Sequence, residues 1–165
     1  LLKLNQIEMV QIKKDTMIEA TVYKIENFQT VQNPYEGHYL HYNTQVSSKK
    51  ERVQVSAGDY RITTQQEGVR YLLETLEPSA TDSFFNWNFF DTILQQKEGF
   101  SPYVWEDKAF ELLENDAALQ KEFERKKTKD PLFAKNAYEQ LDWIHKQSDH
   151  YEKAHLRYPI VKIGD

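Results

Sequence analysis

The sequence lacks cysteine and is poor in glycine, and these two shortages exclude several kinds of chemistry. Its 165 residues include no cysteine, so disulfides, thiolate zinc sites and cysteine nucleophiles are ruled out. Its 5 glycines stand singly, so no glycine-rich loop can cradle a phosphate and no Gly-x-Ser-x-Gly turn can present a serine. The sequence therefore lacks the loops that nucleotide binding and acyl transfer usually require.

Long apolar runs and a positive net charge are also missing. The longest apolar stretches, such as Phe84-Phe85 and Ile160-Val161, are much shorter than the roughly 20 residues that a membrane-spanning helix needs. The net charge of -5 argues against a general phosphate-backbone binder. The one basic run, residues 125–129, follows two glutamates and is typical of a solvated helix face. We expect no membrane span and no nucleic-acid partner.

What the sequence does contain is typical of a folded globular protein. Hydrophobic residues make up 39% of the chain and aromatic residues 13%, which is enough apolar surface to offset the entropy lost on folding. The length is that of one ordinary domain. We therefore expect a single domain over residues 1–165.

The first part of the chain, residues 1–64, has the pattern of β-strands. β-branched and aromatic residues recur with a period of two between turn residues, which predicts antiparallel strands joined by short loops. The predicted strands are residues 7–12, 17–25, 39–46, 52–55 and 60–63, with turns at 33–34, 36–37, 47–48 and 57–58. This part should form an antiparallel sheet or sandwich of about five strands.

Residues 65–157 are expected to be mainly helical. Thr64, with Glu67 three residues later, predicts a helix start through reciprocal capping, and Pro78 ends the apolar run Val69, Leu72, Leu73 and Leu76. Ser101-Pro102 and Asp130-Pro131 predict two further helix starts, and Asp116 caps a helix between them. The predicted buried residues are Trp105, Ala109, Leu112 and Leu113, then Leu119 and Phe123, then Phe133, Ala137, Leu141 and Ile144.

The last predicted element is a strand at residues 158–163, which should return to pair with the N-terminal sheet. Strands first and helices afterwards predict an α+β fold, with three to four helices before this returning strand.

The histidines do not form a recognisable hydrolytic metal site. None of the five is followed three residues later by glutamate, and no His-Glu-x-x-His occurs. His38 and His41 lie three apart in a predicted strand, so their side chains should point to opposite faces. Glu152 and His155 have the spacing of half of a carboxylate-bridged site, but the second half is missing. We assign no catalytic residue and no metal ligand.

The densest feature is the aromatic segment 84–90, which allows two interpretations. An exposed row of rings could bind sugars or peptides, and Phe85, Trp87 and Phe89 are the candidate residues for such a platform. Alternatively, the rings form the hydrophobic seam between sheet and helices, because burying them removes a large apolar area from water. We favour the hydrophobic seam.

Several stretches of the chain are similar to a known family. The region from Val69 to Ile163 resembles the C-terminal region of bacterial zinc carboxypeptidase-like peptidases. The resemblance lies in Tyr71–Pro78, Asp82–Asp91, Gln96–Val104 and His155–Pro159, and it extends upstream to Tyr35–His38 and Ala57–Tyr60. None of these motifs is a chemical signature.

The resemblance implies a metallopeptidase domain before Leu1, which would carry a His-x-x-Glu pair, a further zinc-binding histidine and a catalytic glutamate. None of these groups maps onto this chain, so zinc and hydrolase activity would belong to the upstream domain. The family's usual export implies a periplasmic or extracellular location.

Two function hypotheses follow from these observations. The first is a non-catalytic C-terminal accessory domain that packs on or orients the upstream peptidase domain of the same polypeptide. The second is a glycan- or peptide-binding module attached to an exported enzyme. A third hypothesis is an independent hydrolase that uses unrecognised carboxylates. It is disfavoured because the sequence contains no recognisable nucleophile or metal cluster.

Overall fold

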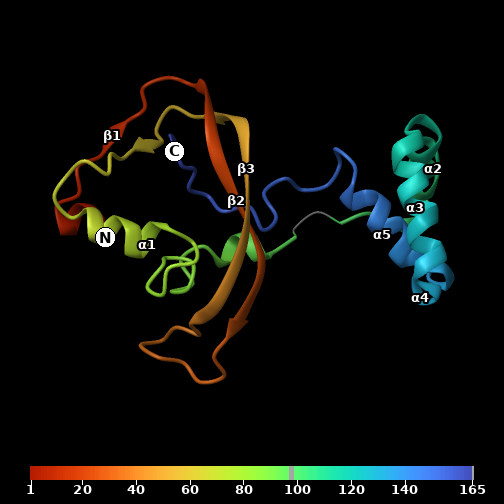
Figure 1. The fold of residues 1–165 in the computed structure, drawn as a ribbon, viewed down its shortest axis with the longest axis horizontal. Helices are drawn as coiled ribbons and strands as arrows, with labels where there is room; N and C mark the ends of the chain where they lie inside the picture. The colour runs from red at the N-terminus through yellow and green to blue at the C-terminus, as the bar shows by residue number, and fades with distance from the viewer. Residues whose placement is uncertain (97–98, 165) are drawn as a thin grey trace. The chain divides into compact units, whose positions relative to one another are not determined.

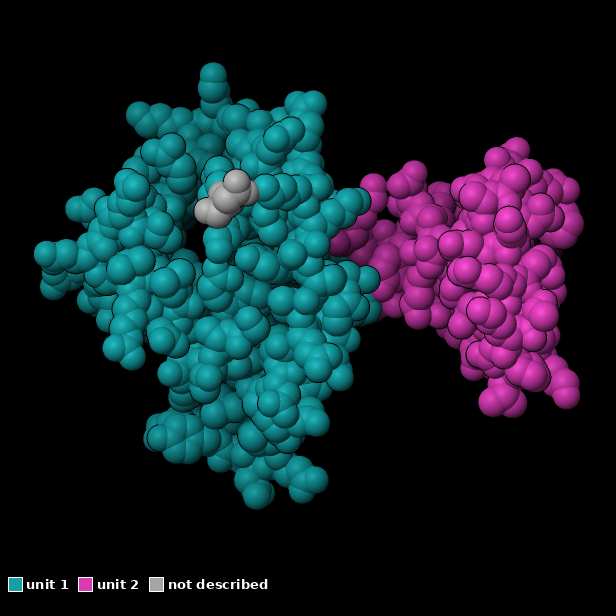
Figure 2. All heavy atoms as spheres, in the orientation of Figure 1, with its two compact units in different colours: residues 1–95, 154–165 teal, residues 96–153 magenta. Residues whose placement is uncertain are grey.

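The computed structural model describes residues 1–96 and 99–164. They form two compact units, which Figure 2 shows in different colours. The sheet unit comprises residues 1–95 and the chain from Ala154 onward, and the helical unit comprises Gln96–Lys153. The helices bury their apolar residues against one another in a core of their own, within what the sequence predicts to be one domain over residues 1–165.

The sheet unit contains two antiparallel pairs of strands, one helix and two short 3-10 turns (Figure 1). In chain order these are η1 (Lys3–Asn5), β1 (Val10–Gln11), β2 (Thr16–Thr30), β3 (His41–Val55), β4 (Tyr60–Arg61), α1 (Val69–Leu76) and η2 (Asp91–Leu94). β1 pairs with β4, and β2 pairs with β3. The α+β class is therefore confirmed, whereas the described residues form two-stranded sheets in place of one larger sheet.

β2 and β3 form one long twisted ribbon (Figure 1). The predicted turn at Ser47-Ser48 is wrong, because β3 runs straight through it and joins the two strands predicted at 39–46 and 52–55. Ser47 lies opposite Lys24 and Ser48 opposite Tyr23, so both serines take part in the ladder. The pairing partner on β2 overrides their local preference for turns.

The C-terminal chain returns to β2, as the sequence predicted, although as isolated bridges. Thr21 and Lys162 exchange main-chain hydrogen bonds of 2.8 and 3.0 Å. The Tyr158 N–H donates to the Tyr23 carbonyl at 2.9 Å, and the Ile25 N–H donates to Leu156 at 2.9 Å. These bonds cover the outer edge of β2.

Two apolar clusters form the core of the sheet unit. One contains Ala20, Val22 and Val53 of the ribbon. The other joins Ile25 of β2, Phe85 and Tyr158, which come from three distant parts of the chain. The Tyr158 hydroxyl donates to the Leu76 carbonyl at the end of α1, 2.9 Å away, so the C-terminal chain also holds this helix.

Helix α1 begins at Val69, several residues later than predicted from Thr64. Gln66 is occupied in loop contacts, since its amide accepts from the Glu8 N–H at 2.8 Å and donates to the Thr63 carbonyl at 2.6 Å. Gly68 has a φ of 80°, and a Cβ built there would lie 2.8 Å from Ile7 Cδ1. A left-handed glycine in close contact with Ile7 therefore sets the start of the helix.

The helical unit contains α2 (Pro102–Asn115), α3 (Ala117–Lys129), α4 (Pro131–Lys135) and α5 (Ala137–Lys146). The predicted caps Asp116 and Asp130 are confirmed, because each carboxylate accepts two main-chain N–H groups. The single helix predicted from Pro131 is divided at Asn136, whose side chain accepts from the Glu139 N–H at 3.2 Å and caps α5.

The core of the helical unit contains most of the residues predicted from helical spacing. Trp105, Ala109, Phe123, Phe133 and Ile144 are buried, and Leu112, Leu113 and Leu141 pack against them. Ala137 is exposed, which corrects the prediction, because the break at Asn136 changes the face that this position presents. The described residues contain no helix long and apolar enough to cross a membrane.

Replacing Tyr158 with phenylalanine should destabilise the protein by about 1–2 kcal/mol, because the Leu76 carbonyl would lose its donor. Burial raises the pKa of the Tyr158 hydroxyl, with a smaller contribution from Glu77, so the group is a neutral donor at ordinary pH. Urea unfolding of Y158F measures the effect, with Y60F as the control because Tyr60 is 49% exposed. Equal stability of the two variants would show that the bond contributes nothing.

Acid should weaken the helical unit through His145. This side chain is 3% exposed, and the rings of Phe100, Trp105 and Tyr151 surround it. Its Nδ1 has no hydrogen-bond partner among the residues that the structure describes. Burial lowers its pKa, opposed by Asp142, so the unfolded chain binds a proton that the folded chain resists. Stability should be full above pH of about 6.5 and fall as the pH drops below it.

Thermal unfolding of the whole chain between pH 7.5 and 5 measures this effect. The His145→Phe variant should show a smaller loss of stability over the same interval, because it removes the group that titrates. An unchanged pH dependence in that variant would exclude His145 as the cause.

Candidate functional site

Two loops of the sheet unit come together beside the start of β3. One is the connection between β2 and β3, residues 31–40, and the other follows α1. The Asn88 amide donates to the Tyr39 carbonyl at 2.9 Å, and the His41 N–H donates to the Asn86 carbonyl at 2.9 Å. The Thr44 hydroxyl donates to the Asn86 side chain at 2.7 Å. The first bond joins the two loops, and the other two attach the loop after α1 to β3.

The β2–β3 connection narrows to a tight turn at its tip. Tyr35 and His38 exchange main-chain hydrogen bonds of 2.9 and 2.8 Å. Glu36 and Gly37 between them have positive φ values of 48° and 79°, which is the conformation of a two-residue type I′ turn. The sequence predicted this turn from Gly37. The turn places Tyr35 and His38 opposite each other in the main chain at the loop tip.

His41 is buried next to these two loops. The ring is 6% exposed and lies between Phe28 and Phe85, at centroid distances of 4.6 and 5.0 Å. Its Nδ1 is 2.9 Å from the Thr30 hydroxyl, and its Nε2 is 3.1 Å from an Asp91 oxygen.

Hydroxyl, imidazole and carboxylate in this order also occur in hydrolase triads. In this chain the ring is packed into the core, and its bonds join three segments of the fold. We therefore interpret His41 as a structural link that positions the loops. Its partners are 11 and 50 residues away in the sequence, so no local motif indicated this network.

The aromatic segment 84–90 divides between core and surface. Phe85 is fully buried and Phe90 packs on Tyr158 at 5.4 Å, so these rings belong to the core. The candidate Phe85 is thus wrong as part of an exposed platform. Asn88 has a φ of 65°, a left-handed conformation that turns the chain and leaves Phe89 52% exposed. The rings of this segment are therefore divided between core and surface, and binding at Trp87 and Phe89 stays a prediction.

Four neighbouring rings form what we call the aromatic surface, made of Tyr35, His38, Trp87 and Phe89. Tyr35 and Phe89 are exposed, and His38 and Trp87 are half-buried. His38 is its centre, 5.6 Å from Trp87 and 6.0 Å from Phe89 between ring centroids. Tyr35 lies 6.2 Å from Trp87 and is 60% exposed. Trp87 itself is half-buried, and its indole N–H lies 3.5 Å from Asp82. Such rings can bind the apolar faces of peptides or sugars, while their polar tips stay hydrated.

The histidines are distributed among different environments. His38 lies on the aromatic surface, His41 in the core of the sheet unit, and His145 in the core of the helical unit. Across residues 1–96 and 99–164, no three His, Asp or Glu side chains lie close enough together to hold a metal ion.

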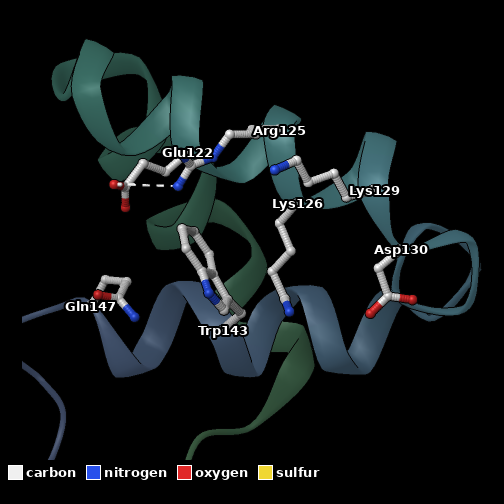
Figure 3. A pocket seen from close by; sticks show the side chains of 7 residues that line it. All are labelled: Glu122, Arg125, Lys126, Lys129, Asp130, Trp143 and Gln147. Carbon is white, nitrogen blue, oxygen red and sulfur yellow. Dashed lines mark ion pairs between the residues drawn. The ribbon is translucent and has the colours of Figure 1, made fainter.

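A second candidate is a charged hollow on the helical unit, with a volume of about 530 Å³ (Figure 3). Its lining comes from α3, from Asp130 and from the α5 region, namely Glu122, Arg125, Lys126, Lys129, Asp130, Trp143 and Gln147. Two of the cations that line the hollow have local partners. Arg125 lies 3.9 Å from Glu122, and Lys126 Nζ lies 4.7 Å from the centre of the Phe133 ring.

The charged hollow is a weaker candidate than the aromatic surface. Arg125 and Glu122 are 66% and 61% exposed, so solvent screens their charges. The Lys126 ammonium lies over the Phe133 ring in a cation–π contact, so it is already engaged within the helical unit. The basic run predicted as a solvated helix face lies on α3 in this mostly exposed setting.

Replacing Asn86 with alanine should loosen the aromatic surface. The buried amide donates to the carbonyls of Ala80 and Thr81 and accepts from Thr44, so its loss leaves several groups unsatisfied. We expect a loss of about 2–3 kcal/mol and a shift of the Trp87 indole signal in NMR spectra. Asn33→Ala, at an exposed position, is the control and should change stability by less than about 0.5 kcal/mol. A stable N86A protein with an unmoved indole signal would contradict this role.

Comparison with known proteins identifies no family for this chain. No family model matches the chain, and no curated protein or solved structure is significantly similar to it. The resemblance to zinc carboxypeptidase-like peptidases thus remains an expectation from the sequence motifs alone.

Proposed function

We propose that this chain is a non-catalytic accessory region that makes a contact through its aromatic surface. The partner is the upstream peptidase domain of the same polypeptide, which would hold the zinc and perform hydrolysis in an exported protein. The observation that carries the proposal is the cluster of Tyr35, His38, Trp87 and Phe89, in which Tyr35 and Phe89 are exposed. The identity of the partner rests on the sequence resemblance.

The geometry suits a protein contact for two reasons. The rings sit on loops that are fixed to the core through Asn86 and His41, so little conformational freedom remains to be lost on binding. Tyrosine and tryptophan residues are also enriched in the centres of protein interfaces, where their rings fill pockets on the partner. Such a contact could orient the peptidase domain or restrict which peptides reach it.

The second candidate function is direct binding of a glycan or peptide at the same surface. It is favoured by the neighbouring rings of Tyr35 and Trp87, which offer apolar faces with a hydroxyl and an indole N–H at their edges. Flat rings of this kind stack on sugars and on extended peptides. The two functions differ in their partner and share the site.

Phe89→Ser should weaken the contact with the peptidase domain by at least about tenfold, because an exposed ring of the contact surface would be lost. The peptidase domain would be produced from the coding sequence that precedes Leu1, and its affinity for the whole chain measured by calorimetry. Since Phe89 is 52% exposed, the stability of the isolated chain should change little. Phe110→Ser is the matched control, because Phe110 is 65% exposed on the helical unit.

Three outcomes would contradict the proposal. They are equal affinities of F89S and F110S, an upstream sequence without a His-x-x-Glu pair, and zinc-dependent release of C-terminal amino acids by this chain alone. The ligand-binding alternative would be favoured if chito-oligosaccharides or short peptides moved the Trp87 indole signal in the wild type and did so less in F89S.

A further inference from the structure

Helix α2 exposes large apolar side chains on the face that points away from the helical core. The other face packs into that core through Trp105 and Ala109. Tyr103 is 89% exposed, Phe110 is 65% exposed, and Val104 lies beside Tyr103 and is 61% exposed. Tyr103 and Phe110 are two helical turns apart, so they lie on one line along α2, separated by about 10 Å of its axis.

The charged residues on this face are acidic. Four exposed carboxylates stand between and beside the two rings, namely Glu106, Asp107, Glu111 and Glu114. Lys108, the one basic residue of α2, lies about 100° farther around the helix than Asp107 and so outside the line of rings. The ion pairs of the helical unit lie within α3, within α5 and in the loop after α5, and no described cation pairs with a carboxylate of α2.

This arrangement opposes the stability of α2 itself. Glu111 lies four residues after Asp107 and three before Glu114, so like charges face one another along the helix. The last turn of α2 has no basic residue and contains Glu114, although the C-terminal end of a helix carries a negative partial charge. The last turns of α3 and α5 do contain basic residues. Rules of this kind are broken mainly where side chains serve a function, and cations from a partner would relieve the repulsion.

We propose that the exposed face of α2 docks a basic amphipathic helix of a partner protein. A second helix matches the spacing, because apolar side chains seven residues apart on it repeat at the distance that separates Tyr103 from Phe110. Its arginine or lysine side chains pair with Asp107, Glu111 and Glu114. Arginine suits the face best, because a guanidinium binds carboxylates and also stacks on aromatic rings. This site lies on the helical unit and does not depend on the aromatic surface.

The test uses the whole chain and a capped helical peptide of about 21 residues, which is long enough to hold helical structure in water. The peptide has Leu at every seventh position, Arg three and four residues from each Leu, and Ala elsewhere. Titration should move the amide NMR signals of residues 102–115 saturably. Replacing Arg with Glu, or scrambling the order so that Leu and Arg share no face, should weaken binding by at least about tenfold.

Phe110→Ser tests the apolar part of the face. It should weaken binding of the peptide by at least about tenfold, whereas Phe89→Ser, which also removes an exposed ring, should bind like the wild type. These two variants exchange roles in the contact with the peptidase domain. Failure of one proposal can therefore be told apart from failure of the other.

Glu114→Lys tests the charge. It replaces a like-charge neighbour of Glu111 and places a cation in the last turn of α2, so the melting temperature should stay equal or rise. Binding of the peptide should nevertheless fall by at least about tenfold. Glu67→Lys makes the same change in net charge at an exposed position of the sheet unit and should bind like the wild type.

Four outcomes would overturn the proposal. They are equal binding by E114K and E67K, equal binding of the original and scrambled peptides, signal shifts confined to residues outside α2, and no saturable binding. Self-association of the free chain that E114K abolishes would also overturn it, because the face would then serve a second copy.

Discussion

The sheet unit depends on the return of the C-terminal chain to β2. A two-stranded ribbon alone is marginally stable in water, because most of its main chain and one of its faces stay exposed. The bonds between Thr21 and Lys162 and from Tyr158 to Tyr23 cover one edge of the ribbon. Tyr158 then fills the core beside Ile25 and Phe85, and its hydroxyl holds the end of α1. One short segment thus connects the ribbon, the helix and the aromatic loop.

The aromatic surface follows from the same core. Phe85 anchors the loop after α1, and His41 connects the start of β3 to Thr30 and Asp91. With the loop fixed at these points, the left-handed residue Asn88 leaves Phe89 at the surface. The exposed rings are therefore held by buried neighbours, which is the arrangement that a preorganised binding surface requires.

The proposed contact lies at one end of the ribbon. At the start of β3, the loops carry rings that suit an apolar partner.

Local sequence determined the features that depend on neighbouring residues. The caps Asp116 and Asp130, the turn at Gly37 and the apolar spacing around Trp105 were all predictable, because each involves residues within a few positions. Tertiary structure alone decided that β3 runs through Ser47-Ser48, that the helices form a separate unit, and which aromatic side chains are buried. These outcomes depend on partners far away in the chain, and the energy of burial and pairing exceeds the local preferences that the sequence displays.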